Sequence, residues 1–299
     1  MTRGLAYAAC DHATAGPYRG DGRIRVCASC GLVFLAPEMR IPDLDAYYAH
    51  GSVWRDRAGD PVLAALARDD ARGRWRLIMA HAHAAGTALL DIGSHEGTFV
   101  AEARVHGFAA CGIEPNARLV AAARMRHIPL TEGSAESFSL PGTFNIITMF
   151  HVLEHISDID RALLHIIPHL ARDGALVLEV PDIESRPAVR HGLSWKYIAR
   201  EHVRYFSRQT LADALCRHGF EIVFATRRNG EIPYLSFADI RDYFISRGGR
   251  PRDRFAMKRP VQHPLMERPR YFPVRRAFSS IIHAIGGADH LFVIARRIS

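Results

Sequence analysis

The chain has 299 residues, a formal net charge of +8 and 48% hydrophobic residues. This length predicts one large domain with an appendage, and the hydrophobic content is sufficient for a buried core. The sequence contains no run of 18 apolar residues and no basic-then-apolar leader, so we exclude a membrane-spanning helix and expect a cytoplasmic protein.

The cysteines near the start of the chain indicate a small metal-binding module. Because cytoplasmic cysteines stay reduced, paired cysteines there indicate a metal more often than a disulfide. Residues 27–31 read CASCG, a C-x-x-C-G knuckle, and a tetrahedral site needs two further ligands. The candidate ligands of a structural Zn2+ in a zinc-ribbon-like module over residues 1–40 are therefore Cys10, His12, Cys27 and Cys30. The alternative is a ribbon that packs through residues 33–35 without a metal.

Two helical patterns follow this module, over about residues 44–50 and 61–85. The second combines apolar positions with several arginines, among them Arg68, Arg72 and Arg74. We interpret residues 41–85 as a helical cap over one edge of the next domain, with a plain packing helix as the alternative.

Residues 89–99 read LLDIGSHEGTF, in which an apolar run ends in Asp91 and a glycine-bearing turn opens a helical pattern. A second apolar run ends in Glu114. This order is typical of a nucleoside site at the carboxyl edge of a parallel sheet. Gly93 permits close approach of the ligand, and Gly97 permits tight entry into the helix. Glu114 can accept hydrogen bonds from both hydroxyls of a ribose.

The spacing of the glycines distinguishes between two kinds of nucleoside ligand. A dinucleotide site requires G-x-G-x-x-G, whereas here His95 stands where a middle glycine is expected. Glu96 would repel a diphosphate. The loop therefore favours a ligand with a zwitterionic amino-acid tail.

The downstream sequence continues the alternation of strands and helices. Residues 144–150 predict a buried strand, HVLEH follows at residues 151–155, and a helical pattern runs to Leu170. A turn at Asp173-Gly174 then precedes a strand over residues 175–181. With the motifs DIGSHEGTF, GIEPN, FHVLEHISD and LxxDGALVLEVPD, this order resembles class I S-adenosylmethionine-dependent methyltransferases over roughly residues 86–227.

The resemblance implies an α/β fold with a Rossmann-like seven-stranded sheet whose last strand is antiparallel. We expect the catalytic core at residues 86–230 and the last strand at residues 288–299, where residues 291–296 fit it. The cofactor-binding residues that the resemblance implies are Asp91, Gly93, Ser94, Gly97, Glu114, Pro115, Ala135, Glu136, Phe150, His151 and Val152. Asp91, Gly93 and Gly97 would line the methionine end of the cofactor, and Glu114 would hold its ribose. Ala135 and Glu136 would lie by the adenine, and residues 150–152 would lie beneath the sulfonium. His95 departs from the glycine of many members, which leaves the path of the loop open.

Three further segments resemble those of one subgroup of these methyltransferases. Residues 27–37 read CASCGLVFLAP, a tyrosine pair follows at residues 47–48, and EHVRYFS occupies residues 201–207. The same features occur in a subgroup that includes nucleotide-sugar C-methyltransferases. By this resemblance, Glu201 and His202 are candidates for acid/base catalysis on the acceptor. This chain lacks the subgroup's large C-terminal domain and its glycine-rich H-G-G-S-x-R segment, so a simpler methyltransferase with the same EHxxYFS segment is an alternative.

Residues 184–206 are expected at the carboxyl end of the sheet, where acceptors bind in this kind of fold. His202 has a second interpretation, in which it only hydrogen-bonds the loop backbone. His151 is the alternative base, although it and His155 are expected mainly to shape the pocket. Ser207 predicts the N-cap of the next helix.

The positive charge is concentrated in residues 247–276, which hold ten Lys and Arg against two acids, with five prolines. We interpret residues 231–287 as a basic, proline-rich insertion. It could be a solvated loop, help to bind an anionic acceptor, or contact RNA or an anionic membrane. Because no array of stacking aromatics or nucleic-acid module accompanies it, nucleic acid is not the expected partner.

The expected function is S-adenosylmethionine-dependent O- or C-methylation of a small molecule, such as a sugar, a nucleotide-sugar or another secondary metabolite. Methyl transfer is an in-line displacement, so the enzyme must align the acceptor and exclude water. Where the acceptor is not already nucleophilic, a general base assists by removing its proton. The alternatives are an RNA or protein methyltransferase that docks through the basic insertion, and a non-catalytic scaffold subunit that binds the cofactor.

Overall fold

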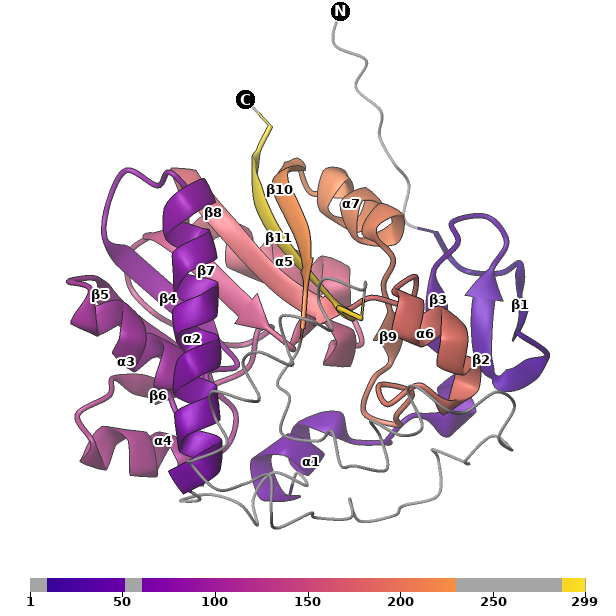
Figure 1. Cartoon of the computed structure of the whole chain (residues 1–299), viewed down its shortest axis with the longest axis horizontal. Helices are drawn as coiled ribbons and strands as arrows, with labels where there is room; N and C mark the ends of the chain where they lie inside the picture. Colours follow the sequence, from indigo (N-terminus) through magenta and orange to yellow (C-terminus); the bar gives the residue numbers. More distant parts are fainter. Residues whose placement is uncertain (1–9, 52–60, 230–286, 299) are drawn as a thin grey trace, which may run out of the picture.

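The computed structural model describes residues 10–51, 61–229 and 287–298. Seven strands form one mixed sheet in the order β10-β11-β8-β7-β4-β5-β6 (Figure 1). Strands β4 to β8 run parallel, whereas β11 is antiparallel to both β8 and β10, which confirms the expected seven-stranded sheet. The strands of this sheet are β4 (Ala88–Ile92), β5 (Ala109–Glu114), β6 (Leu130–Glu132), β7 (Phe144–Phe150), β8 (Leu170–Pro181), β10 (Phe220–Arg228) and β11 (His290–Arg297).

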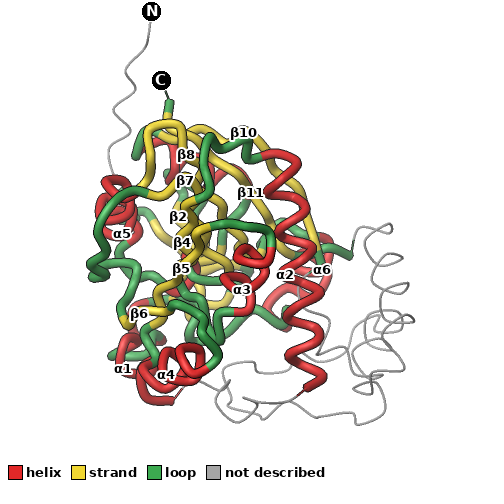
Figure 2. The backbone as a smooth tube through the Cα atoms, turned by 90° about the vertical axis from the view of Figure 1, so that its left-hand side faces the viewer, coloured by secondary structure: helices red, strands yellow, loops and turns green. Residues whose placement is uncertain are grey.

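Successive side chains of the central strands enter two different cores, one on each face of the sheet. Leu89 packs with α2 (Pro61–His81), α3 (Thr98–Val105) and α4 (Ala117–Met125). Leu90 packs with α5 (Ile159–Ile166) and α7 (Arg208–Arg217) on the opposite face. Figure 2 shows α2 and α3 on one side of the strands and α5 on the other. Because both faces are covered, these strands read as nearly continuous apolar runs.

Side-chain caps fix where three of the helices begin. Asn116 accepts hydrogen bonds from the amides of Arg118 and Leu119, and Asp158 accepts one from the amide of Arg161. Ser207 forms a capping box with Thr210 at the start of α7, which confirms the expected N-cap. Each such cap stabilises its helix by about 1 kcal/mol.

Strand β8 begins earlier than the sequence predicted. Asp173 and Gly174 were expected to form a turn, but both lie inside β8. The pairing with β7 shifts in register between Phe144 and Ile146, so the extra residues bulge from the ladder instead of ending the strand. A Cβ on Gly174 would lie 2.9 Å from the carbonyl oxygen of Ala171, which explains why a glycine occupies this position.

A second, smaller sheet contains four strands in the order β1-β2-β3-β9. Three of them, β1 (Ala15–Tyr18), β2 (Asp21–Cys27) and β3 (Val33–Leu35), come from the N-terminal module, whereas β9 (Arg204–Tyr205) comes from the expected acceptor loop. Figure 1 shows β1 to β3 beside β9 and α6 (Arg186–His191). The sequence did not predict this pairing. The N-terminal module therefore shares a sheet with the loop that follows β8.

A third apolar cluster joins the same two segments. Ile24, Val33 and Leu35 of the module pack with Trp195 and Tyr205 of the loop. Within the described ranges, one further helix is α1 (Leu44–Gly51), and short 3-10 turns occur at Pro37–Met39, Leu153–His155, Ile167–His169 and Gly192–Ser194.

Most of the basic segment predicted as an insertion, residues 230–286, lies outside the described residues. Within the ranges that are described, no helix combines the length and the apolar character that crossing a membrane requires.

Candidate active site

The glycine loop after β4 is joined to the end of β5. The amides of Gly93 and Ser94 both donate to the carbonyl oxygen of Ile113, at 2.8 and 2.9 Å. Gly93 has a φ of +75°, and a Cβ there would lie 2.3 Å from a methyl group of Val152. Only glycine fits this position, because any side chain would meet both the backbone strain and the Val152 contact.

His95 has a φ of +51°, in the left-handed region that glycine favours. The loop thus has the backbone conformation of a glycine at this position although its residue is histidine. The backbone amide of His95 donates to Glu114 Oε2 at 2.8 Å, which holds the loop against the end of β5.

Glu114 lies at the carboxyl end of β5 and is 7% exposed. Its Oε1 accepts the amide of Asn116 at 3.0 Å and its Oε2 accepts that of His95. Burial raises the pKa of this carboxyl, although both amides favour the charged form. Each oxygen can accept one more hydrogen bond. This spare capacity is compatible with the expected ribose contact.

Asp91 is buried at the end of β4 and accepts a hydrogen bond of 2.6 Å from the hydroxyl of Thr148. Burial raises the pKa of Asp91 to about 7. The Ser94 hydroxyl donates to the Asp91 carbonyl at 2.6 Å and so closes the start of the loop.

The other expected cofactor residues follow neighbouring strands of the same sheet. Pro115 follows β5, Ala135 and Glu136 follow β6, and His151 and Val152 follow β7. Because these strands are parallel, the fold brings the whole expected set to one edge of the sheet.

His151 has a φ of +56° and lies between two carboxylates. Its Nδ1 is 3.1 Å from Glu154 Oε1 and its Nε2 is 3.7 Å from Glu179 Oε1. Burial alone would lower the pKa of His151, but these two carboxylates raise it to about 9. The two carboxylates therefore favour the charged, proton-donating form of the His151 ring.

Glu179 is a fully buried carboxylate that the sequence analysis did not identify as a site residue. It accepts hydrogen bonds from Arg74 at 2.8 Å, from Arg228 at 2.6 Å and from His290 Nδ1 at 3.0 Å. Asp70 pairs with both arginines, at 2.8 and 2.5 Å. Burial opposes the negative charge of Glu179, but the guanidinium groups of Arg228 and Arg74 hold the pKa of Glu179 well below its usual range. An acid inside the apolar strand LVLEVP was the signal that could have revealed this cluster.

A second buried carboxylate, Glu154, lies in the turn after β7. Its Oε1 accepts from His151, whereas its Oε2 is buried and has no hydrogen-bond partner among the described residues. Burial raises the pKa of Glu154, but the bond from His151 and the neighbouring imidazoles outweigh it and lower the value to about 2. Ligand atoms of Glu154, His155 and His202 all lie within 4.8 Å of one another.

The expected acid/base pair lies beside this carboxylate. The Nδ1 of His202 is buried, and no described residue bonds to it. Burial lowers the pKa of His202 to about 3, so its ring is neutral at neutral pH. Glu201 contributes its backbone carbonyl, which accepts a hydrogen bond of 2.8 Å from His155 Nδ1. Glu154 has a carboxylate oxygen within 4.8 Å of a ring nitrogen of His202. The sequence analysis had not assigned Glu154 to the acceptor site.

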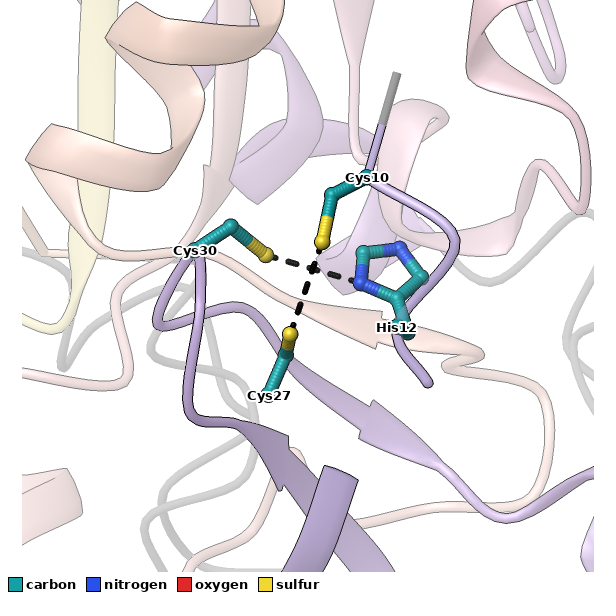
Figure 3. A group of neighbouring side chains, drawn as sticks. All are labelled: Cys10, His12, Cys27 and Cys30. Carbon is teal, nitrogen blue, oxygen red and sulfur yellow. Dashed lines mark hydrogen bonds between the residues drawn. The ribbon is translucent and has the colours of Figure 1, made fainter. Parts of the chain in front are cut away.

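The structure also brings the four candidate zinc ligands together. Figure 3 shows the side chains of Cys10, His12, Cys27 and Cys30 pointing toward one common centre. The Cys10 and Cys27 sulfurs are 3.5 Å apart, and Cys30 Sγ is 3.5 Å from His12 Nδ1. Tetrahedral zinc–ligand bonds would separate such pairs by about 3.6–3.8 Å. The residues present therefore fit a Zn2+ ion.

The knuckle itself has the hydrogen bonds of a thiolate site. Burial raises the pKa of the Cys27 thiol, but bonds from His12, from Thr14 and from the amides of Ser29 and Cys30 lower it to about 5. The amide of Gly31, whose φ is +73°, closes the turn on the carbonyl of Cys27 at 2.9 Å.

Backbone hydrogen bonds link this module to the acceptor side of the site. The amide of Leu35 donates to the carbonyl of Val203 at 3.1 Å. The amide of Val203 donates in turn to the carbonyl of Glu154 at 2.9 Å. Strand β3 is thus two hydrogen bonds away from the turn that carries Glu154.

The chain was compared with models of protein families and with curated protein sequences. A family model described as a methyltransferase domain matches residues 55–224, more than half of the chain. No match was found among curated protein sequences.

Two solved structures share the fold. One contains the Haloferax volcanii Trm112 methyltransferase activator in complex with a protein described as a methyltransferase, with 12% identity, a TM-score of 0.55, and coverage of 86% of this chain and 98% of that one. The other is a SAM-dependent methyltransferase from Archaeoglobus fulgidus, with 17% identity, a TM-score of 0.50, and coverage of 77% and 94%. At these identities the likeness concerns the fold alone.

Proposed function

The chain belongs to the class I S-adenosylmethionine-dependent methyltransferases, and we propose that it methylates an oxygen or carbon of a small molecule. The observation that carries this proposal is the ring of aromatic and imidazole side chains at the carboxyl edge of the sheet. Tyr197 lies 5.0 Å from His290, 6.0 Å from His202 and 6.5 Å from His151, measured between ring centroids. Tyr48 joins the group through a 2.7 Å hydrogen bond to His155. A pocket lined by these aromatic and imidazole side chains suits a compact hydroxylated acceptor.

For the cofactor, we propose the residues that follow β4 to β7. Asp91, Gly93, Ser94 and Gly97 would bind the methionine end, and Glu114 with Pro115 would bind the ribose. Ala135 and Glu136 would lie against the adenine, and Phe150, His151 and Val152 beneath the sulfonium. The left-handed loop after β4 and the spare acceptor capacity of Glu114 support this arrangement.

For the acceptor, we propose His202 and Glu201. Methyl transfer requires the acceptor atom in line with the methyl–sulfur bond, and such positioning can supply roughly 7–11 kcal/mol of the barrier. The Nδ1 atom of neutral His202, to which no described residue bonds, can accept a hydrogen bond or a proton from an acceptor hydroxyl. With a pKa of about 3, His202 is a weak base by itself, since general bases work best near the operating pH.

We propose a structural Zn2+ bound by Cys10, His12, Cys27 and Cys30. Its role would be to fix β3, and through β3 the strand β9 and the loop that carries His202. Reduced thiolates at this site suit the cytoplasm, where we place the protein. The alternatives of an RNA or protein acceptor, and of an anionic acceptor held by the basic segment, depend on residues outside those described.

The test is calorimetric titration of the purified chain with S-adenosylmethionine and S-adenosylhomocysteine, followed by a screen for S-adenosylhomocysteine release. Nucleotide-sugars and hydroxylated metabolites are the first acceptors to screen. We expect micromolar binding of both cofactor forms and turnover with a small hydroxylated acceptor. Turnover only with RNA or protein would contradict the acceptor class, and binding without any turnover would favour a scaffold subunit.

A further inference from the structure

Two buried polar atoms in the acceptor region have no partner among the described residues. These are Oε2 of Glu154, a residue that is 1% exposed, and Nδ1 of His202. Leaving a buried donor or acceptor unsatisfied costs about 1–3 kcal/mol, and more for a charged group. The two atoms belong to residues whose ligand atoms lie within 4.8 Å of each other. A shared ligand between them would remove both costs at once.

Each residue of this group is oriented by a hydrogen bond at another atom. Glu154 accepts from His151 through Oε1 at 3.1 Å. His155 Nδ1 lies 2.8 Å from the carbonyl oxygen of Glu201 and 2.7 Å from the hydroxyl of Tyr48, and these two contacts orient its ring. The imidazole of His202 donates a hydrogen bond to the backbone carbonyl of Tyr197, while its Nδ1 has no partner in the described part of the chain. Metal-binding histidines and carboxylates characteristically have such outer hydrogen bonds.

The surrounding charge also favours a cation at this position. Glu154 contributes a buried carboxylate to the group, and the hydroxyl of Tyr48, 2.7 Å from His155 Nδ1, adds no positive charge there. His151 contacts Oε1 of Glu154 and leaves Oε2 toward the group. The neighbouring group of His151, Glu179 and His290 differs, because two arginines already neutralise Glu179.

We propose that Glu154, His155 and His202 bind a divalent metal ion that holds the acceptor. Ligands about 2.1 Å from one ion lie roughly 3–4 Å apart, so small side-chain rotations would suffice to close the group around it. Two histidines and one carboxylate leave coordination positions open for a substrate. An acceptor with two adjacent oxygens, such as a vicinal diol or a hydroxyketone, can chelate the ion there.

This inference rests on the proposed methyltransferase function and adds a role for its acceptor site. The ion lowers the pKa of the hydroxyl that binds it, so the hydroxyl can lose its proton to solvent without a strong protein base. The resulting oxyanion forms the new oxygen–carbon bond as the carbon–sulfur bond breaks, and S-adenosylhomocysteine leaves. His202 then acts as a metal ligand and needs no basicity of its own.

The test is to reload the metal-free full chain with Co2+ and to record its absorption spectrum and metal content. Thiolate ligands give Co2+ intense charge-transfer bands, whereas imidazole and carboxylate ligands give only weak visible bands. We expect one equivalent of each kind. A single equivalent with thiolate bands in the unsubstituted chain would overturn the proposal.

Substitutions assign the second equivalent to its ligands. Glu154→Gln and His202→Ala should each weaken the site without thiolate bands by at least about tenfold and leave the thiolate bands intact. Cys30→Ser should do the reverse, and the exposed His127→Asn should change neither site. Unchanged Co2+ affinity in both Glu154→Gln and His202→Ala would also overturn the proposal.

The acceptor part of the proposal has its own probe. Catechol, with two adjacent hydroxyls, should shift the weak visible bands of the second Co2+ and leave the thiolate bands unchanged. Unshifted bands would overturn chelation of the acceptor. A chain that binds the second Co2+ but releases no S-adenosylhomocysteine with any small acceptor would instead contradict the proposed function and leave the metal site standing.

Discussion

Glu179 and Glu154 are both fully buried carboxylates beside His151, yet their surroundings differ. Two arginines and His290 contact Glu179, and Asp70 completes a closed network of charges around it. Glu154 has one bonded oxygen and one without a partner in the described part of the chain. Burial of a charge therefore does not identify a functional residue by itself. The useful distinction is whether the protein satisfies the whole group or leaves part of it available to a ligand.

The largest expected effect is on stability, at Glu179. Its substitution by alanine leaves Arg74 and Arg228 buried without their main partner, and breaking a buried ion pair in this way costs about 3–5 kcal/mol. Urea unfolding of Glu179→Ala measures this loss. Glu154→Gln is the matched control, for which we expect a loss of roughly 1 kcal/mol or less. Equal losses in the two variants would remove the distinction between the carboxylates.

A third buried carboxylate, Asp91, sharpens the comparison through its pH dependence. Its folded pKa of about 7 lies above the unfolded value, so its stabilising contribution is full below about pH 4 and is lost as the pH rises through 7. Compared with Asp91→Asn, the unsubstituted chain should lose on the order of 2–4 kcal/mol of unfolding free energy between pH 4 and pH 8. Unfolding of both proteins across this range provides the measurement, and parallel curves would contradict the assignment.

Glu114 should affect cofactor binding more than folding. If Glu114→Ala removes the contacts to the ribose, the dissociation constant for S-adenosylmethionine should rise roughly 10- to 100-fold, as expected for the loss of hydrogen bonds to a charged group. Calorimetry measures this change, with the exposed Glu132→Ala at the end of β6 as the control. An unaltered dissociation constant would remove the ribose assignment.

The smallest effect on stability is expected at His202. Because its Nδ1 is buried without a described partner, His202→Ala should change the unfolding free energy by no more than about 1 kcal/mol, in either direction. Turnover should nevertheless fall sharply while the affinity for S-adenosylmethionine stays constant. The control Tyr205→Phe loses only a hydroxyl that bonds the backbone of Ala199. Unchanged turnover in His202→Ala would exclude a role on the acceptor side.

Sequence reasoning predicted the features that depend on local pattern. The buried strand at residues 144–150, the Ser207 cap and the antiparallel last strand follow from periodicity, capping chemistry and the resemblance to a known fold. The four candidate zinc ligands were also identified, because the knuckle fixes two and only a few nearby side chains can supply the others. Each of these signals lies within a short stretch of chain.

The features that the sequence did not reveal depend on contacts between distant segments. The Glu179 network joins Arg74, Arg228 and His290, which are up to 216 residues apart. The pairing of β3 with β9 joins Val33 to Tyr205, and no local pattern indicates it. Only the fold shows that Glu154 lies beside His202, because tertiary packing, and not sequence spacing, brings the turn after β7 to the loop after β8.

The pairing of β3 with β9 has a consequence for any attempt to shorten the protein. A chain that began after residue 40 would leave β9 as an unprotected edge strand and would expose apolar side chains of the loop such as Trp195 and Tyr205, which Ile24 and Leu35 help to cover. Exposed edges of this kind template aggregation. The N-terminal module therefore cannot be removed, or exchanged for that of a relative, as an independent cassette. It would have to be transferred together with the loop that it covers.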